Sequence, residues 1–116
     1  MQNVFISAHF KRQLKPYVKK YRSITDDVAD LLDGFDKRQH IDLGHGLYKA
    51  RLKSRDIPRG KSKSFRTIIF FIESEEIFAP IAIYFKGVQE ELSQKELNDH
   101  LQEVLTELRR IGIFSV

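Results

Sequence analysis

The sequence contains no cysteine, which excludes disulfide bonds, thiol catalysis and zinc sites built from cysteine. It also has no apolar run that approaches the ~20 residues of a membrane-spanning helix. The first residues, MQNVFISAHFKRQ, lack the long apolar core and the small-residue cleavage site of a secretory signal. We therefore expect a cytoplasmic protein. The 116 residues, 41% hydrophobic and 31% charged, are typical of one globular domain over residues 1–116.

Motifs for metals and nucleotides are absent as well. The histidines, His9, His40, His45 and His100, form no HxxxH or HExxH pair. The glycine patterns GxxxxGKS/T and GxGxxG do not occur, and Gly60-Lys61-Ser62 is a fragment of the first without its upstream glycine. The acids gather in the turn at 73–76 and on the last helix, where solvated carboxylates are expected. The sequence therefore predicts no metal and no cofactor.

The apolar periodicity predicts an α+β fold in the order β-α-α-β-β-β-α. It consists of a four-stranded, mainly antiparallel sheet with an N-terminal helical hairpin and a C-terminal helix. The predicted strands are residues 3–7, 47–53, 65–72 and 77–85, and the predicted helices run from about 9 to 21, 24 to 35 and 94 to 110. Caps are predicted at Ser23 with Asp26 and at Ser93 with Glu96. Pro80 predicts a bulge or an edge position.

Positive charge is concentrated between Leu47 and Arg66, in the run LYKARLKSRDIPRGKSKSFR. Its cations are Lys49, Arg51, Lys53, Arg55, Arg59, Lys61, Lys63 and Arg66. The segment has one acid, Asp56, so its net charge is +7. The net charge of the whole chain is +4, so the remaining residues sum to −3. Strand alternation places the first three cations on one face, roughly 7 Å apart. The chain is therefore strongly polarised.

Two interpretations of this charge are open. A solvated sheet face with a mobile basic loop would carry it without any ligand. Such a face usually mixes signs, as this chain does elsewhere, and like charges at this density repel. The density therefore favours an anion site for phosphates, most of all those of a nucleic acid. The outer face of the first helix is also basic, either as solvated lysines or as a contact for RNA or an acidic partner.

Tyr84 and Lys86 share a parity at the end of the last strand, so a meander can bring them to Arg51 and Arg66 around one phosphate. The alternative for Tyr84 is an ordinary core aromatic with its hydroxyl at the rim. Such a set can cleave RNA without a metal through attack of the 2′-hydroxyl on phosphorus. The arginines would stabilise the developing charge, and Tyr84, or a lysine whose pKa is depressed by like-charged neighbours, would transfer protons. DNA lacks the 2′-hydroxyl and would only be bound.

The runs GLYKARL, RGKS, FRTIIFF, IAIYFK and LSQKEL together resemble the RelE/ParE superfamily of bacterial toxins, and most closely its RelE and HigB branch. The resemblance covers nearly the whole chain and is most specific from Leu47 to Lys86. It implies a RelE-like toxin fold and a toxin of a type II toxin–antitoxin system, with an antitoxin that wraps and blocks it. Members of the RelE and HigB branch are metal-independent endoribonucleases that cleave mRNA at the ribosome, so the resemblance implies inhibition of translation.

Carried over by position, the resemblance implies catalytic roles for Arg51, Lys61, Arg66, Tyr84 and Lys86. It implies RNA-binding roles for Lys49, Lys53, Arg55, Arg59 and Lys63. One departure concerns the loop, where relatives often have paired glycines ahead of the arginine and this chain has Lys63-Ser64. The exchange stiffens the loop and adds a charge to it.

Two other functions are open at this point. ParE-like members inhibit DNA gyrase without catalysis, and Tyr84 would then be dispensable. A nucleic-acid-binding module without toxicity would also carry the cationic segment, and its affinity should fall by about 10²–10³-fold over a fourfold rise in salt.

Overall fold

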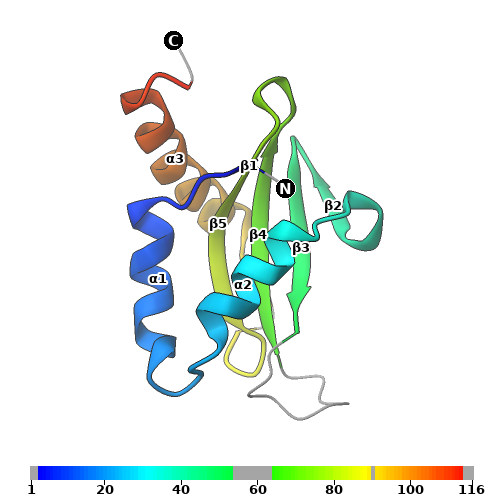
Figure 1. Cartoon of the computed structure of the whole chain (residues 1–116), viewed down its shortest axis with the longest axis vertical. Helices are drawn as coiled ribbons and strands as arrows, with labels where there is room; N and C mark the ends of the chain where they lie inside the picture. Colours follow the sequence, from blue (N-terminus) through cyan, green and yellow to red (C-terminus); the bar gives the residue numbers. More distant parts are fainter. Residues whose placement is uncertain (1–2, 54–63, 90, 114–116) are drawn as a thin grey trace.

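The computed structural model describes residues 3–53, 64–89 and 91–113. Its main elements are β1 (Asn3–Val4), α1 (Ala8–Val18), α2 (Ile24–Asp33), β2 (Ile41–Gly44), β3 (Leu47–Leu52), β4 (Phe65–Ile72), β5 (Ile77–Phe85) and α3 (Gln94–Arg110). Short 3-10 helices, Lys37–Gln39 and Glu73–Glu75, precede β2 and β5. In Figure 1, α2 crosses in front of the strands.

The sheet has the strand order β1-β5-β4-β3-β2. Strands β3, β4 and β5 pair antiparallel, which confirms the predicted meander, and β1 pairs with β5 in parallel. The sequence predicts four strands and the structure has five, because residues 41–44 pair with β3 as an edge strand. This strand was missed because it is only four residues long and exposed at every position, so no apolar periodicity marks it.

The two central strands occupy the residues predicted for them, 65–72 and 77–85. Pro80 lies at a β-bulge, since pairing passes from Ile68 with Ala82 to Ile69 with Pro80. Because proline has no N–H to donate to the ladder, a bulge is one of the few places where a paired strand tolerates it. The bulge prediction is therefore confirmed.

The predicted caps have different outcomes. Ser93 and Glu96 form the complete capping box at the start of α3. Ser23 is the N-cap residue of α2 and Asp26 lies in its first turn, as predicted, but the Ser23 hydroxyl donates to Asp27 Oδ2 at 2.7 Å and makes no capping hydrogen bond to a backbone N–H. Strand β1 ends earlier than predicted because Ser7 caps α1 and accepts from the N–H of Phe10 at 2.9 Å.

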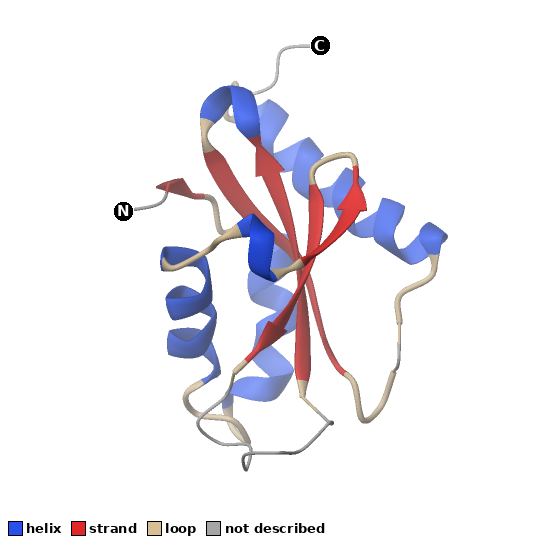
Figure 2. Cartoon of the chain, turned by 90° about the vertical axis from the view of Figure 1, so that its right-hand side faces the viewer, coloured by secondary structure: helices blue, strands red, loops and turns tan. Residues whose placement is uncertain are grey.

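Each face of the sheet has its own hydrophobic core, and helices lie on both sides in Figure 2. We call one side the hairpin face, where α1 and α2 pack on Tyr48, Ala50, Leu52, Phe65 and Ile69. We call the other the α3 face, where α3 packs on Ile68, Ala79, Ile81, Ala82 and Tyr84. Because side chains alternate along a strand, Lys49, Arg51 and Arg66 belong to the α3 face.

The turn from β2 to β3 depends on glycine. Gly44, His45 and Gly46 all have positive φ, at 85°, 54° and 81°. A Cβ on Gly46 would stand 2.9 Å from the carbonyl oxygen of Phe71, whereas one on Gly44 would meet nothing within 4 Å. The Gly46 carbonyl also accepts from the N–H of Phe71 at 2.8 Å, which fixes the start of β3 against β4.

Candidate functional site

Three of the predicted site residues form one row across the sheet. Arg51 on β3 is paired with Arg66 on β4, and Arg66 is paired with Tyr84 on β5. Neighbouring strands lie about 4.8 Å apart, so the row spans about 10 Å. All three residues belong to the α3 face, and the row lies where β3 and β5 end and β4 begins. The register thus brings together side chains separated by up to 33 positions in the sequence.

Ser64, the residue before β4, connects the two arginines. Its Oγ accepts from Arg51 Nε at 3.3 Å and from Arg66 Nη1. Its carbonyl oxygen accepts from the N–H of Lys86 at 2.8 Å, which continues the pairing of β4 with β5 by one residue. Ser64 is only 5% exposed, so this hydroxyl lies beneath the cationic surface.

The electrostatics of the row follow from burial and from like charge. Burial lowers the pKa of Arg66, the neighbouring Arg51 lowers it further, and Tyr84 acts in the opposite direction. Burial also raises the pKa of Tyr84, with Arg66 opposing the shift and Glu91 adding to it. An ordinary tyrosine already titrates near 10, so the Tyr84 phenol keeps its proton at neutral pH. Tyr84 is therefore a proton donor in the resting site.

Tyr84 fits both interpretations that its position in the sequence left open. Its ring is 5% exposed and belongs to the core under α3, as an ordinary core aromatic would. It is also paired directly with Arg66, and the charge of that arginine acts on its hydroxyl. A buried ring holds the hydroxyl in a fixed place beside the arginines, which is useful for transferring a proton.

The remaining predicted residues fall into two groups. Lys49 is half-buried on β3, two residues before Arg51, while Lys53 follows β3 and is exposed. Lys86 follows β5, is half-buried, and is held opposite Ser64 by its backbone. Arg55, Arg59, Lys61 and Lys63 lie outside the described residues. The structure therefore places six of the ten predicted site residues on or next to the α3 face.

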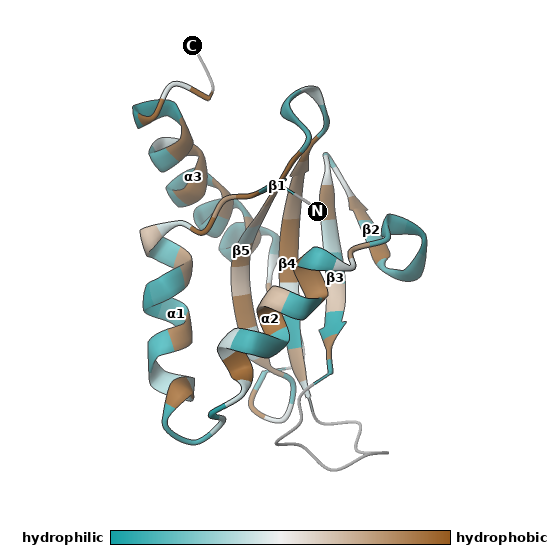
Figure 3. Ribbon diagram, in the orientation of Figure 1, coloured by the Kyte–Doolittle hydropathy of each residue, from teal (hydrophilic) through white to brown (hydrophobic). Residues whose placement is uncertain are grey.

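Helix α3 leaves this row uncovered on the β3 side. The helix packs through Leu97, Val104 and Leu108, with Ile81, Ala82 and Tyr84 in the same core. Arg51 is exposed and Arg66 half-buried, and Figure 3 shows hydrophilic colour on the arrowhead of β3, next to a short hydrophobic segment. The cations of the row are thus accessible to a large anion from solvent.

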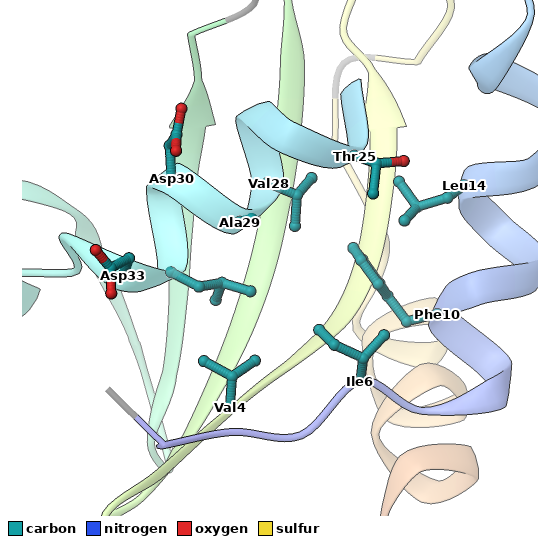
Figure 4. A pocket seen from close by; sticks show the side chains of 10 residues that line it. Val4, Ile6, Phe10, Leu14, Thr25, Val28, Ala29, Asp30 and Asp33 are labelled. Carbon is teal, nitrogen blue, oxygen red and sulfur yellow. The ribbon is translucent and has the colours of Figure 1, made fainter. Parts of the chain in front are cut away.

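A pocket on the hairpin face has a different character. It has a volume of about 450 Å³ and opens between β1, α1 and α2. Its lining consists of Val4, Ile6, Phe10, Leu14, Thr25, Val28, Ala29, Asp30, Leu32 and Asp33. Figure 4 shows the apolar side chains converging while the carboxylates of Asp30 and Asp33 point away. No predicted site residue lines it, and its apolar wall offers no group for phosphate chemistry.

Within residues 3–53, 64–89 and 91–113, no three side chains of His, Cys, Asp or Glu gather as a metal site would require. The same part of the chain has no helix that is both long and apolar enough to cross a membrane.

A model of the family described as the RelE toxin of the RelE/RelB toxin–antitoxin system matches residues 2–111. The chain belongs to the RelE toxin family. It is thus a toxin of a toxin–antitoxin system, and a toxin of this kind has a cognate antitoxin as its partner. No curated protein matches the chain in sequence. Among solved structures, a double arginine-to-alanine mutant of E. coli toxin RelE in the free state matches at 15% identity, with a TM-score of 0.47, over 77% of this chain and 87% of that one.

The residue that sequence reasoning missed in this RelE-family toxin is Ser64. Serine in a basic loop is common and carries no signal by itself. The available signal was its position, because residues i and i+2 on a strand share a face and Ser64 stands two before Arg66. The diagonal contact to Arg51 depends on the register of β3 with β4, which the sequence does not supply.

Proposed function

We propose that this toxin is a metal-independent endoribonuclease that cleaves mRNA at the ribosome and so stops translation in the cytoplasm. The observation that supports it most is the row of Arg51, Arg66 and Tyr84, in which strand pairing brings an exposed arginine, a half-buried arginine and a buried, protonated phenol together on the α3 face. Two cations can stabilise the negative charge that develops on the phosphate oxygens, and the phenol can act as the general acid, so the row supplies two of the three contributions that transesterification of a phosphodiester uses.

In the proposed reaction the 2′-hydroxyl of a nucleotide attacks the adjacent phosphorus as the bond from phosphorus to the 5′-oxygen breaks. The guanidinium groups of Arg51 and Arg66 bind the non-bridging oxygens, whose negative charge grows in the transition state. Tyr84 gives its proton to the leaving 5′-oxygen. A lysine of the cationic loop, Lys61 in this proposal, takes the proton from the 2′-hydroxyl as its neutral amine, and the products are a 2′,3′-cyclic phosphate and a 5′-hydroxyl.

The other cations of the face and loop have a separate role in this proposal. They bind phosphates of neighbouring nucleotides, and they are Lys49, Lys53, Arg55, Arg59 and Lys63. Their contribution is independent of sequence, and it weakens as salt rises because the release of counterions from the RNA then becomes less favourable. The antitoxin blocks activity by covering this charge with a complementary surface.

The test uses purified toxin with a defined mRNA, either free or on a translating ribosome, in the presence of EDTA. The wild type is expected to cleave, and a single 2′-deoxy substitution at the mapped position is expected to abolish cleavage there. Arg66→Ala and Tyr84→Phe should each reduce the rate by about 10²–10³-fold. Arg110→Ala, which removes an exposed arginine from the far end of α3, is the matched control and should cleave normally.

Two results would contradict the proposal. Cleavage that requires a divalent metal, or that continues through the 2′-deoxy position, would exclude this mechanism. Toxicity with intact mRNA, DNA damage signalling and a dispensable Tyr84 would instead indicate inhibition of gyrase. If cleavage occurs only on the ribosome, the ribosome supplies part of the substrate geometry.

A further inference from the structure

We propose that Ser64 is a positioning residue of this site: its hydroxyl oxygen holds the guanidinium groups of Arg51 and Arg66 side by side for one phosphodiester. The inference rests on the proposed function, but its geometric part can be tested without any cleavage. It adds to the site a residue that contacts neither the reacting atoms nor the leaving group.

The contacts converge on a single atom. A serine oxygen can accept two hydrogen bonds, and Ser64 Oγ accepts one from Arg51 Nε at 3.3 Å and one from Arg66 Nη1. The two donors come from different strands, β3 and β4. One hydroxyl therefore ties together two side chains that come from neighbouring strands.

The position of the Ser64 hydroxyl reduces a repulsion that the strand register creates. Arg51 and Arg66 are directly paired across the ladder, and like charges in such a pair repel. A neutral oxygen with partial negative charge between them reduces that repulsion without cancelling their charge. A carboxylate at this position would hold them more strongly, but it would also neutralise the site for phosphate.

Burial separates the hydroxyl from the ligand. Ser64 is 5% exposed while Arg51 is exposed, so the oxygen lies below the guanidinium groups. Each guanidinium has five N–H donors, and the bond to Ser64 uses one of them. Because a guanidinium is planar, fixing one nitrogen restricts the direction of the others. The buried contact thus aims the arginines without competing with phosphate oxygens.

The backbone of Ser64 has a separate task that allows a clean experiment. Its carbonyl oxygen accepts from the N–H of Lys86 at 2.8 Å, and this bond does not depend on the side chain. Ser64→Ala therefore removes the hydroxyl and leaves the end of β5 in place. Ser64→Thr keeps a hydroxyl and serves as the matched variant that should restore function.

The first measurement is geometric. In NMR spectra of the folded toxin, the Nε–H of Arg51 is expected to give a sharp, slowly exchanging signal. That signal should broaden or be lost in Ser64→Ala and should return in Ser64→Thr. Thermal unfolding of both variants controls for the fold. An Arg51 signal that is unchanged in Ser64→Ala would overturn the inference, whether or not the protein cleaves RNA.

The second measurement is functional and uses two probes. Cleavage of unmodified mRNA should show kcat lowered by about 10-fold in Ser64→Ala, with KM changed far less, and Ser64→Thr should recover most of it. Binding of an uncleavable RNA with 2′-deoxy at the cleavage position, followed by fluorescence anisotropy, should weaken by about threefold in Ser64→Ala.

The outcomes separate this inference from the proposed function. If Arg66→Ala and Tyr84→Phe lose activity while Ser64→Ala cleaves and binds like the wild type, the inference is wrong and the function stands. If the wild type does not cleave, the function is wrong, and the Arg51 signal and the binding probe still decide the role of Ser64. A Ser64→Thr variant that folds normally but behaves like Ser64→Ala would show that the hydroxyl is not what matters.

Discussion

The two faces of this sheet are built from the same strands and differ in what they hold. Along β3, Tyr48, Ala50 and Leu52 point into the core under the helical hairpin, while Lys49 and Arg51 belong to the α3 face. The hairpin face is covered by α1 and α2 and is dominated by aliphatic and aromatic side chains. The α3 face is covered over β5 by one helix and carries cations over β3 and β4.

The difference teaches how a small protein combines a stable core with a repulsive site. Because side chains alternate, each residue of β3 and β4 can serve one face without affecting the chemistry of the other. The repulsion between the paired Arg51 and Arg66 is offset by the burial of apolar side chains on the opposite face of the same strands. Substitutions on the hairpin face should therefore change stability, and substitutions in the cationic row should change function.

The largest effect on stability is expected from Ile69→Ala. Ile69 is fully buried on the hairpin face, and deleting such a side chain costs about 2–5 kcal/mol of unfolding free energy. Arg51→Ala, three positions along the same ladder and on the opposite face, should change it by less than about 0.5 kcal/mol. Urea unfolding measures the free energy of unfolding of both variants. An Arg51→Ala variant that is as destabilised as Ile69→Ala would contradict the difference between the two faces.

The next effect is expected at the turn that leads into β3. Gly46→Ala places a Cβ 2.9 Å from the Phe71 carbonyl and forces a side chain at φ +81°, so it should cost more than about 2 kcal/mol. Gly44→Ala has φ +85° but open space, and should cost only about 1–2 kcal/mol. Equal losses in urea unfolding for the two variants would show that the close approach to Phe71 is unimportant.

A smaller effect, of opposite sign, is expected at Thr67. This residue of β4 is fully buried, and its Oγ1 has no hydrogen-bond partner among the described residues. Replacing an unsatisfied buried hydroxyl with a methyl group removes a desolvation penalty, so Thr67→Val should stabilise by about 1 kcal/mol. Thr106→Val, on the exposed side of α3, is the control and should gain nothing. A destabilised Thr67→Val would mean that the hydroxyl does have a partner.

The smallest effect concerns the contact between α1 and α3. His9 Nε2 and His100 Nδ1 are 2.8 Å apart, and the Glu107 carboxylate accepts from the backbone N–H groups of Ala8 and His9. Burial lowers the pKa of both histidines below 6.5, so the unfolded chain takes up protons first as the pH falls. This contribution is complete above pH 6.5 and is lost as the pH falls below it.

The groups that face the two histidines act in both directions. The charges that influence them are those of Arg12, Glu96, Asp99, Glu103 and Glu107. Urea midpoints measured from pH 8 to pH 5 should fall more steeply for the wild type than for His100→Gln, which keeps a polar side chain but does not titrate. Identical pH profiles for the two proteins would remove this contact from the account.

Much of the fold follows from local patterns. The bounds of β4, β5 and α3 were predicted as observed. Burial on both faces gives the two strands continuous apolar runs, and burial along one side gives the helix a periodic leucine stripe. Strand β2 was missed because its pairing depends on the neighbouring strand and not on its own side chains. The hydrogen bond from the Ser23 hydroxyl to Asp27 was likewise not predictable. The hydroxyl can bond either to a backbone N–H or to a nearby carboxylate, and sequence spacing does not show which of the two it chooses.

The site was predictable in part. Parity within each strand grouped Tyr84 with Lys86 and Arg51 with Lys49, and a meander could bring these groups to Arg66, but only the register shows that Arg51, Arg66 and Tyr84 are directly paired. Ser64 was interpreted as a lost glycine that stiffens the loop, while the structure shows its hydroxyl accepting from two arginines. A contact between two strands cannot be predicted from the sequence of one strand, so the role of Ser64 is visible only in the three-dimensional structure.

The most direct test of the central claim is induced expression in a bacterium followed by mapping of mRNA 5′ ends. We predict growth arrest with new 5′ ends inside translated frames for the wild type, and neither for Arg66→Ala at the same level of folded protein. Arrest with no new ends, or the same ends from Arg66→Ala, would contradict the assignment of the cationic row as a site of RNA cleavage.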